Sequence, residues 1–258
     1  MLDYIRIACA VPDVSVGNVK KNCQDICAYI AQADEKNVDL LVFPELALTG
    51  YSCGDLFFQD ALQDAVKAEL QNILSVSEKH EALTVVVGLP LRIDGELFNC
   101  AAVITAGELR GLAVKTFLPD YGGYGERRWF SPASYLRRGY VEARELGIDK
   151  YYSVSIGNDL LIPLGNGANL GVEICEDLWA PVNPSSLLAL NGAHIIVNPA
   201  AAVETVGRKA GRGDMIKETS RRNACIYAFC GAGMRVTARN ESTKRSSLSE
   251  VVCIVSSP

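Results

Sequence analysis

The sequence predicts an α/β fold, and three observations support this prediction. Apolar segments alternate with segments of helical spacing along most of the chain. Several apolar runs, such as LLVF, TVVVG and HIIV, are short and continuous, which is typical of strands buried on both faces. The chain has 258 residues, of which 49% are hydrophobic and 21% charged, so it can bury a large core in one or two domains.

The N-terminal third is expected to alternate between strands and helices. Asn18 is a plausible cap for the first helix, and Pro44 closes the second strand. The strands are predicted at residues 4–11, 39–45 and 84–90, and the helices at 18–33 and about 57–79.

The middle of the chain changes character. LFNCAAVIT, the turn AGEL and RGLAVKTF predict antiparallel strands joined by a hairpin. Residues 118–140 then form a long loop rich in Gly, Tyr and Arg, and a loop of this length in a compact domain is usually functional. Beyond it, strands are predicted at LLIPLG, NLGVEIC, HIIVNP and IYAFCGAG, and helices at 184–190 and about 215–224.

Composition argues against several classes of protein. The net charge of -5 gives no reason to expect nucleic acid as a partner. No run approaches the roughly 18 apolar residues of a membrane span, and the start MLDYIRIAC does not resemble a signal peptide. We therefore expect a cytoplasmic protein that binds neither nucleic acid nor membrane.

The nine cysteines do not indicate a disulfide framework, because their number is odd and most lie in apolar contexts. Cys23 and Cys27 share one helical face and could form half of a metal site, but no CxxC and no nearby His completes it. We expect no metal.

Three predicted strands end in a polar residue of unusual type: Glu45, Lys115 and Cys175. In α/β sheets such strand ends face the crevice where ligands bind. Taken singly, each has an ordinary interpretation, as an acid in a turn, a solvated lysine or a buried cysteine.

A cysteine nucleophile needs a base, because a free thiol is mostly protonated at neutral pH. The two histidines, His80 at a helix end and His194 at a strand start, are best interpreted as structural. A carboxylate beside a lysine offers an alternative: the acid takes the thiol proton and the ammonium stabilises an oxyanion. Glu45, Lys115 and Cys175 suit this chemistry.

The segments around these residues resemble, in order and spacing, the three catalytic segments of the nitrilase (carbon-nitrogen hydrolase) superfamily. They read FPELALTGYSCGDLF, KTFLPDYGGYGERRWF and GVEICEDLW. TGYSCGDLF and ICEDLW look more narrowly like the glutaminase domain of glutamine-dependent NAD synthetases. The resemblance covers residues 1–233, which we expect to form a carbon-nitrogen hydrolase domain.

This resemblance implies a four-layer α-β-β-α sandwich and a role for each residue. Glu45 would be the general base, Lys115 would bind the oxyanion, and Cys175 would attack the glutamine carboxamide. Ammonia would leave, and water would hydrolyse the glutamyl thioester. Glu126, in GERRWF, matches a second glutamate that orients the lysine and the substrate.

Four further residues match positions that line the glutamine pocket of this family, and each has an ordinary alternative. Tyr51 and Tyr121 line the pocket or only pack the loop. Glu176 lines the pocket, or caps the following helix together with Asp177. Arg208 meets the substrate carboxylate, where a guanidinium fork has geometric advantages, or lies in a solvated basic loop.

The resemblance also implies partners. In the whole enzymes, ammonia reaches a synthetase domain that amidates an adenylated nicotinic acid dinucleotide. We therefore expect glutamine as substrate, no cofactor in this domain, and assembly into a homo-oligomer. ATP, Mg and deamido-NAD are expected only at a synthetase domain, which we do not expect within these 258 residues.

Two departures from the family pattern stand out. Ala202 occupies the position of an expected pocket serine, and a missing hydroxyl costs on the order of 1 kcal/mol of substrate binding. Residues 234–258 form an atypical tail that loses the apolar pattern soon after Thr243. A frameshift there is one hypothesis, and the domain is then expected to lack its last strands.

Two rival functions remain. One is a free-standing amidase that acts on another small carboxamide, and the other is a catalytically inactive interaction domain. A nucleotide-binding module fits less well, because GNGANLG at 165–171 precedes its strand and lacks the dinucleotide spacing.

Overall fold

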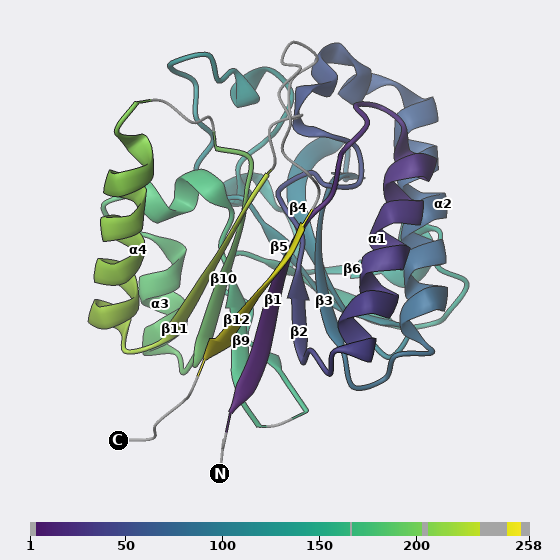
Figure 1. The fold of residues 1–258 in the computed structure, drawn as a ribbon. Coiled ribbons are helices and arrows are strands. Elements are labelled where there is room, and N and C mark those ends of the chain that lie inside the picture. The colour runs from purple at the N-terminus through teal and green to yellow at the C-terminus, as the bar shows by residue number, and fades with distance from the viewer. Residues whose placement is uncertain (1–3, 166, 203–205, 233–246, 254–258) are drawn as a thin grey trace.

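Two β-sheets lie between two pairs of helices in the computed structural model of the chain, which describes residues 4–165, 167–202, 206–232 and 247–253 (Figure 1). Helices α1 (Val19–Glu35) and α2 (Asp60–Ser77) cover one side, and α3 (Pro184–Leu190) and α4 (Arg208–Asn223) cover the other. The predicted four-layer α-β-β-α sandwich is confirmed.

The larger sheet has the strand order β12-β1-β2-β3-β4-β5-β7-β6. Strands β1, β2 and β3 run parallel, whereas β3, β4 and β5 form antiparallel hairpins, so the predicted hairpin is confirmed. The strands are β1 (Ile5–Val11), β2 (Leu40–Val42), β3 (Thr84–Ile93), β4 (Glu96–Thr105), β5 (Glu108–Val114), β6 (Tyr140–Glu142), β7 (Ser153–Gly157) and β12 (Ser247–Cys253).

The smaller sheet has the order β11-β10-β9-β8, and β9, β10 and β11 run parallel. Its strands are β8 (Ile162–Pro163), β9 (Asn169–Val172), β10 (Ile195–Ala200) and β11 (Ile226–Gly231). Short 3-10 helices connect other elements, at Tyr51–Phe58, Glu126–Arg128, Ala133–Tyr135, Ala143–Leu146 and Cys175–Trp179.

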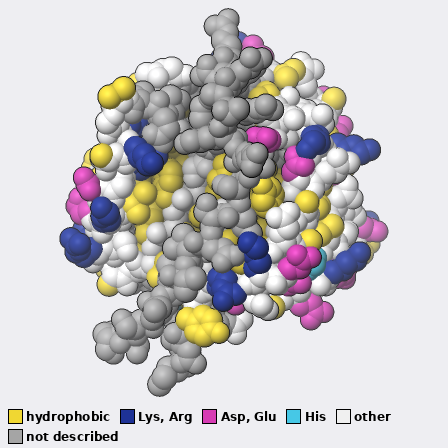
Figure 2. All heavy atoms as spheres, in the orientation of Figure 1, with side chains coloured by type: hydrophobic (Ala, Val, Ile, Leu, Met, Phe, Trp, Pro, Cys, Tyr) yellow, Lys and Arg dark blue, Asp and Glu magenta, His cyan; other side chains and the backbone are white. Residues whose placement is uncertain are grey.

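Apolar side chains fill the spaces between the layers. Ile26 of α1 and Leu70 of α2 are fully buried against the larger sheet, and Ile7 and Val197 meet between the sheets. On the face shown in Figure 2, charged side chains lie mainly toward the outer sides and hydrophobic ones toward the middle. No helix in the described part of the chain is both long and apolar enough to span a bilayer.

The first helix confirms the predicted cap, because the Asn18 side chain accepts a hydrogen bond from the Lys21 N–H. Helix α4 differs from the prediction: it begins at Arg208, seven residues earlier than expected. Its first turns carry no apolar stripe, and Thr219 is its buried residue, so hydrophobic periodicity could not reveal its start.

The tail supplies one strand that the loss of the apolar pattern did not predict. Backbone pairing of β12 with β1 is antiparallel, with Ile5 opposite Cys253 and Val11 opposite Ser247. Thr243, where we place the hypothetical frameshift, lies outside the described residues.

Candidate active site

Glu45 lies in a tight turn after β2, where Leu46 adopts a positive φ of 51°. The turn approaches β3 so closely that a Cβ on Gly88 would lie 2.4 Å from the Leu46 nitrogen and 2.5 Å from the Pro44 oxygen. Only a glycine fits there without movement of the backbone. The turn directs Glu45 inward, where its side chain is fully buried.

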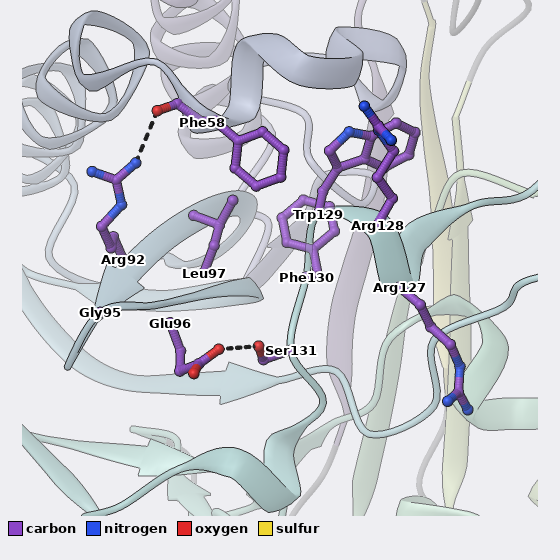
Figure 3. A pocket seen from close by; sticks show the side chains of 10 residues that line it. All are labelled: Phe58, Arg92, Gly95, Glu96, Leu97, Arg127, Arg128, Trp129, Phe130 and Ser131. Atoms are coloured by element: carbon purple, nitrogen blue, oxygen red, sulfur yellow. Dashed lines mark hydrogen bonds between the residues drawn. The ribbon is translucent and has the colours of Figure 1, made fainter.

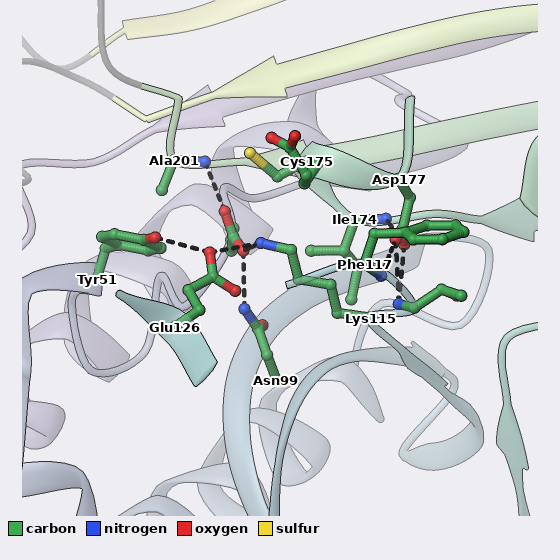
Figure 4. Close-up of polar contacts among 12 residues, drawn as sticks. Tyr51, Asn99, Lys115, Phe117, Glu126, Ile174, Cys175, Asp177 and Ala201 are labelled. Carbon is green, nitrogen blue, oxygen red and sulfur yellow. Dashed lines mark hydrogen bonds and ion pairs between the residues drawn. The ribbon is translucent and has the colours of Figure 1, made fainter. Parts of the chain in front are cut away.

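Lys115 follows β5 and is fully buried. Its Nζ lies 2.5 Å from Glu45 Oε1 and 2.6 Å from Glu126 Oε1 (Figure 4). The structure thus brings Lys115 together with Glu45, which lies 70 positions earlier in the sequence, and with Glu126, which lies 11 positions later. A buried ammonium needs such partners, because an unpaired charge in the interior is costly.

Cys175 begins the 3-10 helix after β9, with a positive φ of 47°. This conformation is uncommon for a residue other than glycine and is often found at functional sites. The Ala201 N–H donates to Glu45 Oε2 at 2.9 Å, and Figure 4 shows the Cys175 sulfur beside Ala201. The Glu45 charge also acts on the Cys175 thiol, as expected for neighbouring groups.

Burial and charge shift the pKa values of this cluster. Burial opposes the charged form of Lys115, but Glu45 and Glu126 outweigh it and hold the lysine pKa well above its usual value. Burial, followed by repulsion from Glu45, raises the pKa of the Cys175 thiol well above its usual value. The resting sulfur is therefore a thiol, which needs a base before it can attack.

Glu126 also has a shifted pKa. Burial is the main cause and raises its pKa to about 7, against the lowering effect of Lys115. Its Oε1 accepts from Lys115 and from the Tyr51 hydroxyl, the latter at 2.7 Å. Its Oε2 is buried and has no hydrogen-bond partner among the described residues.

Glu176 and Tyr121 lie toward the surface. The Tyr121 hydroxyl donates to Glu176 Oε1 at 2.5 Å, and the tyrosine is 53% exposed. The Arg208 guanidinium lies 5.8 Å from the Trp179 ring centre and 5.9 Å from that of Tyr124, and its charge acts on Tyr121. The structure therefore groups these residues and connects them to the buried Lys115 cluster through Tyr124, whose ring centre lies 5.9 Å from that of Tyr121 and 6.3 Å from that of Tyr51. Arg208 is the first residue of α4 and not part of a loop, and its role toward a substrate stays a prediction.

Asp177 takes the capping role that the sequence offered as an alternative. Its carboxylate accepts from the Ile174 N–H at 3.0 Å, as in a cap. It also accepts from the N–H groups of Thr116 and Phe117 at 3.1 and 2.8 Å, so it ties the segment after Lys115 to the Cys175 turn.

Sequence reasoning missed two contacts of Glu45. Asn99 Nδ2 donates to Glu45 Oε1 at 2.7 Å, and this buried Asn in the apolar strand LFNCAAVIT was the available signal. Ala201 contributes only backbone, which leaves no signal in the side chain. The neighbouring Ala202 is partly buried against the core between the sheets, and its effect on binding stays a prediction.

A hollow of about 550 Å³ lies on the outer side of the Glu126 segment (Figure 3). Its charges are largely paired locally: Arg92 with Asp60, and Arg128 with Asp55. It contains none of the residues that contact the Cys175 sulfur. Among the residues that the structure describes, no group of three His, Cys, Asp or Glu side chains is arranged to hold a metal ion.

The chain is similar to several known proteins. The sequence profile of the carbon-nitrogen hydrolase family matches residues 6–230. The glutamine-dependent NAD(+) synthetase of Mycobacterium tuberculosis is 35% identical over 233 residues, which are 89% of this chain and 33% of the relative. That of Thermotoga maritima is 30% identical over 227 residues, 88% of this chain and 35% of the relative. The chain thus spans about a third of the length of these relatives.

Solved structures give the same result for the fold. A crystal structure of a glutamine-dependent NAD(+) synthetase from Cytophaga hutchinsonii matches with a TM-score of 0.76 and 26% identity, over 97% of this chain and 39% of that one. An amidase from Nesterenkonia sp. matches with a TM-score of 0.74 and 18% identity, over 98% of this chain and 92% of that one. At the lower identity the likeness concerns the fold alone.

Proposed function

The chain belongs to the carbon-nitrogen hydrolase family, and from this membership we propose that it hydrolyses the side-chain amide of glutamine and releases ammonia. Cys175 is the nucleophile, Glu45 the general base and Lys115 the cation that stabilises the oxyanion. One observation supports these roles above all: the Ala201 N–H donates to the Glu45 carboxylate, and the Cys175 sulfur lies beside Ala201, so the carboxylate and the thiol are neighbours. A base must lie this close to the proton that it removes.

The reaction proceeds in two halves. Glu45 takes the thiol proton as the sulfur attacks the carboxamide carbon, and Lys115 faces the negative charge that develops on the oxygen. The carbon–nitrogen bond then breaks, and Glu45 returns the proton to the departing ammonia. Water, deprotonated by Glu45, attacks the glutamyl thioester, and the thiol leaves with the proton as glutamate is released.

The outer group of residues suits an amino-acid substrate. Glutamine carries an α-ammonium and an α-carboxylate, and Glu176 and Arg208 offer charges of the complementary signs near Tyr121. We assign Glu176 to the ammonium and Arg208 to the carboxylate. Tyr121 orients these contacts through its hydrogen bond to Glu176, and Tyr51 orients Glu126. A simple aliphatic amide would leave the outer charges unused.

We further propose that the ammonia serves NAD synthesis. The relatives are named glutamine-dependent NAD(+) synthetases and are about three times as long as this chain. A synthetase domain or a separate chain would then amidate deamido-NAD, and ATP and Mg would bind there.

Ammonia release from L-glutamine tests the proposal. We expect Cys175→Ala to lower the rate by roughly 10³-fold or more, because no other group supplies the thioester. Cys27→Ala is the matched control, since Cys27 lies on α1, which covers the outer side of the larger sheet. Equal rates in the two variants would contradict the mechanism. Faster ammonia release from propionamide than from glutamine would indicate a free-standing amidase. If the unmodified chain released no ammonia, it would be a catalytically inactive domain.

A further inference from the structure

Behind Cys175, a row of polar side chains crosses the smaller sheet. The Cys175 N–H donates to Asn198 Oδ1 at 2.8 Å, and the Cys175 carbonyl accepts a longer bond of 3.5 Å from Asn198 Nδ2. Asn198 is fully buried. One side chain thus holds both backbone groups of a residue whose φ of 47° is unfavourable for an L-amino acid.

The orientation of Asn198 depends on Tyr227. Asn198 Nδ2 donates to the Tyr227 hydroxyl at 2.9 Å, and that hydroxyl donates to Glu173 Oε1 in a short contact. Because the phenol proton is directed to the carboxylate, its oxygen accepts from Asn198. This leaves Asn198 Oδ1 to face the Cys175 N–H.

The far end of the row is also fixed. Glu173 is buried, and its Oε2 accepts from the Ser185 N–H at 2.8 Å. Burial and the neighbouring Glu173 raise the pKa of Tyr227 well above its usual value, so the phenol keeps its proton. The hydrogen bonds therefore run in one direction between Glu173 and the Cys175 backbone.

We propose that Tyr227 is a positioning residue for Cys175: by orienting Asn198, it holds the Cys175 backbone so that the sulfur stays beside Glu45. This inference rests on the proposed function, in which Cys175 is the nucleophile. Tyr227 itself contacts Asn198 and Glu173, and it acts on the reaction only through the backbone of the turn.

The test replaces Tyr227 by Phe, which keeps the ring and removes the hydroxyl. Tyr152→Phe is the matched control, since the Tyr152 hydroxyl accepts from the Leu109 N–H at the far end of β5. We expect Tyr227→Phe to lower kcat for glutamine by roughly tenfold or more, because small displacements of reacting groups cost this much. KM should stay within about twofold, because the outer residues are unchanged, and Tyr152→Phe should change neither value.

A double-variant cycle separates positioning from general destabilisation. If Tyr227 acts through Asn198, adding Tyr227→Phe to Asn198→Ala should lower kcat no further. Multiplicative losses in the double variant would overturn the inference, and so would an unchanged kcat in Tyr227→Phe.

Alkylation of Cys175 by iodoacetamide, followed by mass spectrometry of its peptide, gives a readout that does not depend on turnover. We expect the rate in Tyr227→Phe to fall about threefold or more, because the thiol moves away from its base. A rate equal to that of Tyr152→Phe would overturn the inference even in a chain that does not hydrolyse glutamine. If wild type and Cys175→Ala release ammonia equally, the proposed function fails, and the alkylation result still decides the role of Tyr227. Should Tyr227→Phe not fold, Asn198→Ala must show the same split between kcat and KM and the same slower alkylation.

Discussion

Lys115 and Glu45 form a buried ion pair in which each charge offsets the cost of burying the other. The lysine is fully buried between Glu45 and Glu126, and in the proposed mechanism its Nζ faces the developing oxyanion. In the same proposal Glu45 is the base for the thiol.

Glu45→Gln tests this assignment with little change of shape. The carboxamide cannot take the thiol proton, so we expect kcat for ammonia release to fall by about 10²–10⁴-fold. Glu108→Gln, an exposed carboxylate at the start of β5, serves as control. If Glu45→Gln keeps a kcat within about twofold of the control, another group is the base.

The sequence could indicate Glu45, Lys115 and Cys175 because each is a polar residue at the end of an apolar run. Asn99 was accessible by the same logic, since a polar side chain inside a buried strand calls for a partner. The contact from Ala201 could not be predicted from the sequence, because almost every residue has a backbone N–H and the direction of that group depends on tertiary structure.

At the scale of elements, the turn after β2 is held in place by the strand beside it. Gly88 lets the Pro44–Leu46 backbone approach β3, and the Leu48 N–H donates to the Gly88 carbonyl at 3.1 Å. The position of Glu45 therefore depends on a missing side chain in the neighbouring strand.

Gly88→Ala should lower both stability and activity. The added methyl would overlap backbone atoms, so we expect the free energy of unfolding to fall by about 1–3 kcal/mol, measured by urea denaturation, together with a lower kcat. Gly139→Ala is the control, because a Cβ there meets no atom within 4 Å. Equal stability of the two variants would show that the turn adapts.

The elements themselves were predictable to different degrees. Strands such as β10 and helices such as α1 could be predicted from the spacing of their apolar residues and from capping residues. Strand β7, with only five residues, and the polar helix α4 lack that signal, and their positions depend on packing against distant parts of the chain.

At the scale of the molecule, the four layers place the candidate site at the junction of the two sheets. Glu45 and Lys115 follow strands of the larger sheet, and Cys175 and Ala201 follow strands of the smaller one. Alternating strands and helices alone predicted an α/β fold but not this layering, which came from the family resemblance. Local patterns do not specify which face of a sheet meets another.

The buried Glu126 makes the stability of the whole fold depend on pH. Burial raises its pKa in the folded chain from 4.5 to about 7. Between these values the folded chain holds a proton that the unfolded chain has released, so the free energy of unfolding falls as pH rises through this window. Glu126→Gln should remove this contribution, at most about 1.4 kcal/mol per pH unit. Urea denaturation from pH 4.5 to 7 measures the free energy of unfolding at each pH. If this free energy fell with pH as steeply in Glu126→Gln as in wild type, the raised pKa of Glu126 would be contradicted.

If Cys175 is the nucleophile, it forms a covalent bond with the glutamyl group during turnover, and acid quenching traps this intermediate. The reaction with glutamine is stopped by acid, the chain is digested, and the masses of the cysteine peptides are measured by mass spectrometry. The account predicts a mass increase of one glutamyl group on the Cys175 peptide, absent from the other cysteine peptides and lost in alkaline hydroxylamine, which cleaves thioesters. Steady release of ammonia with the adduct on a different cysteine would contradict it.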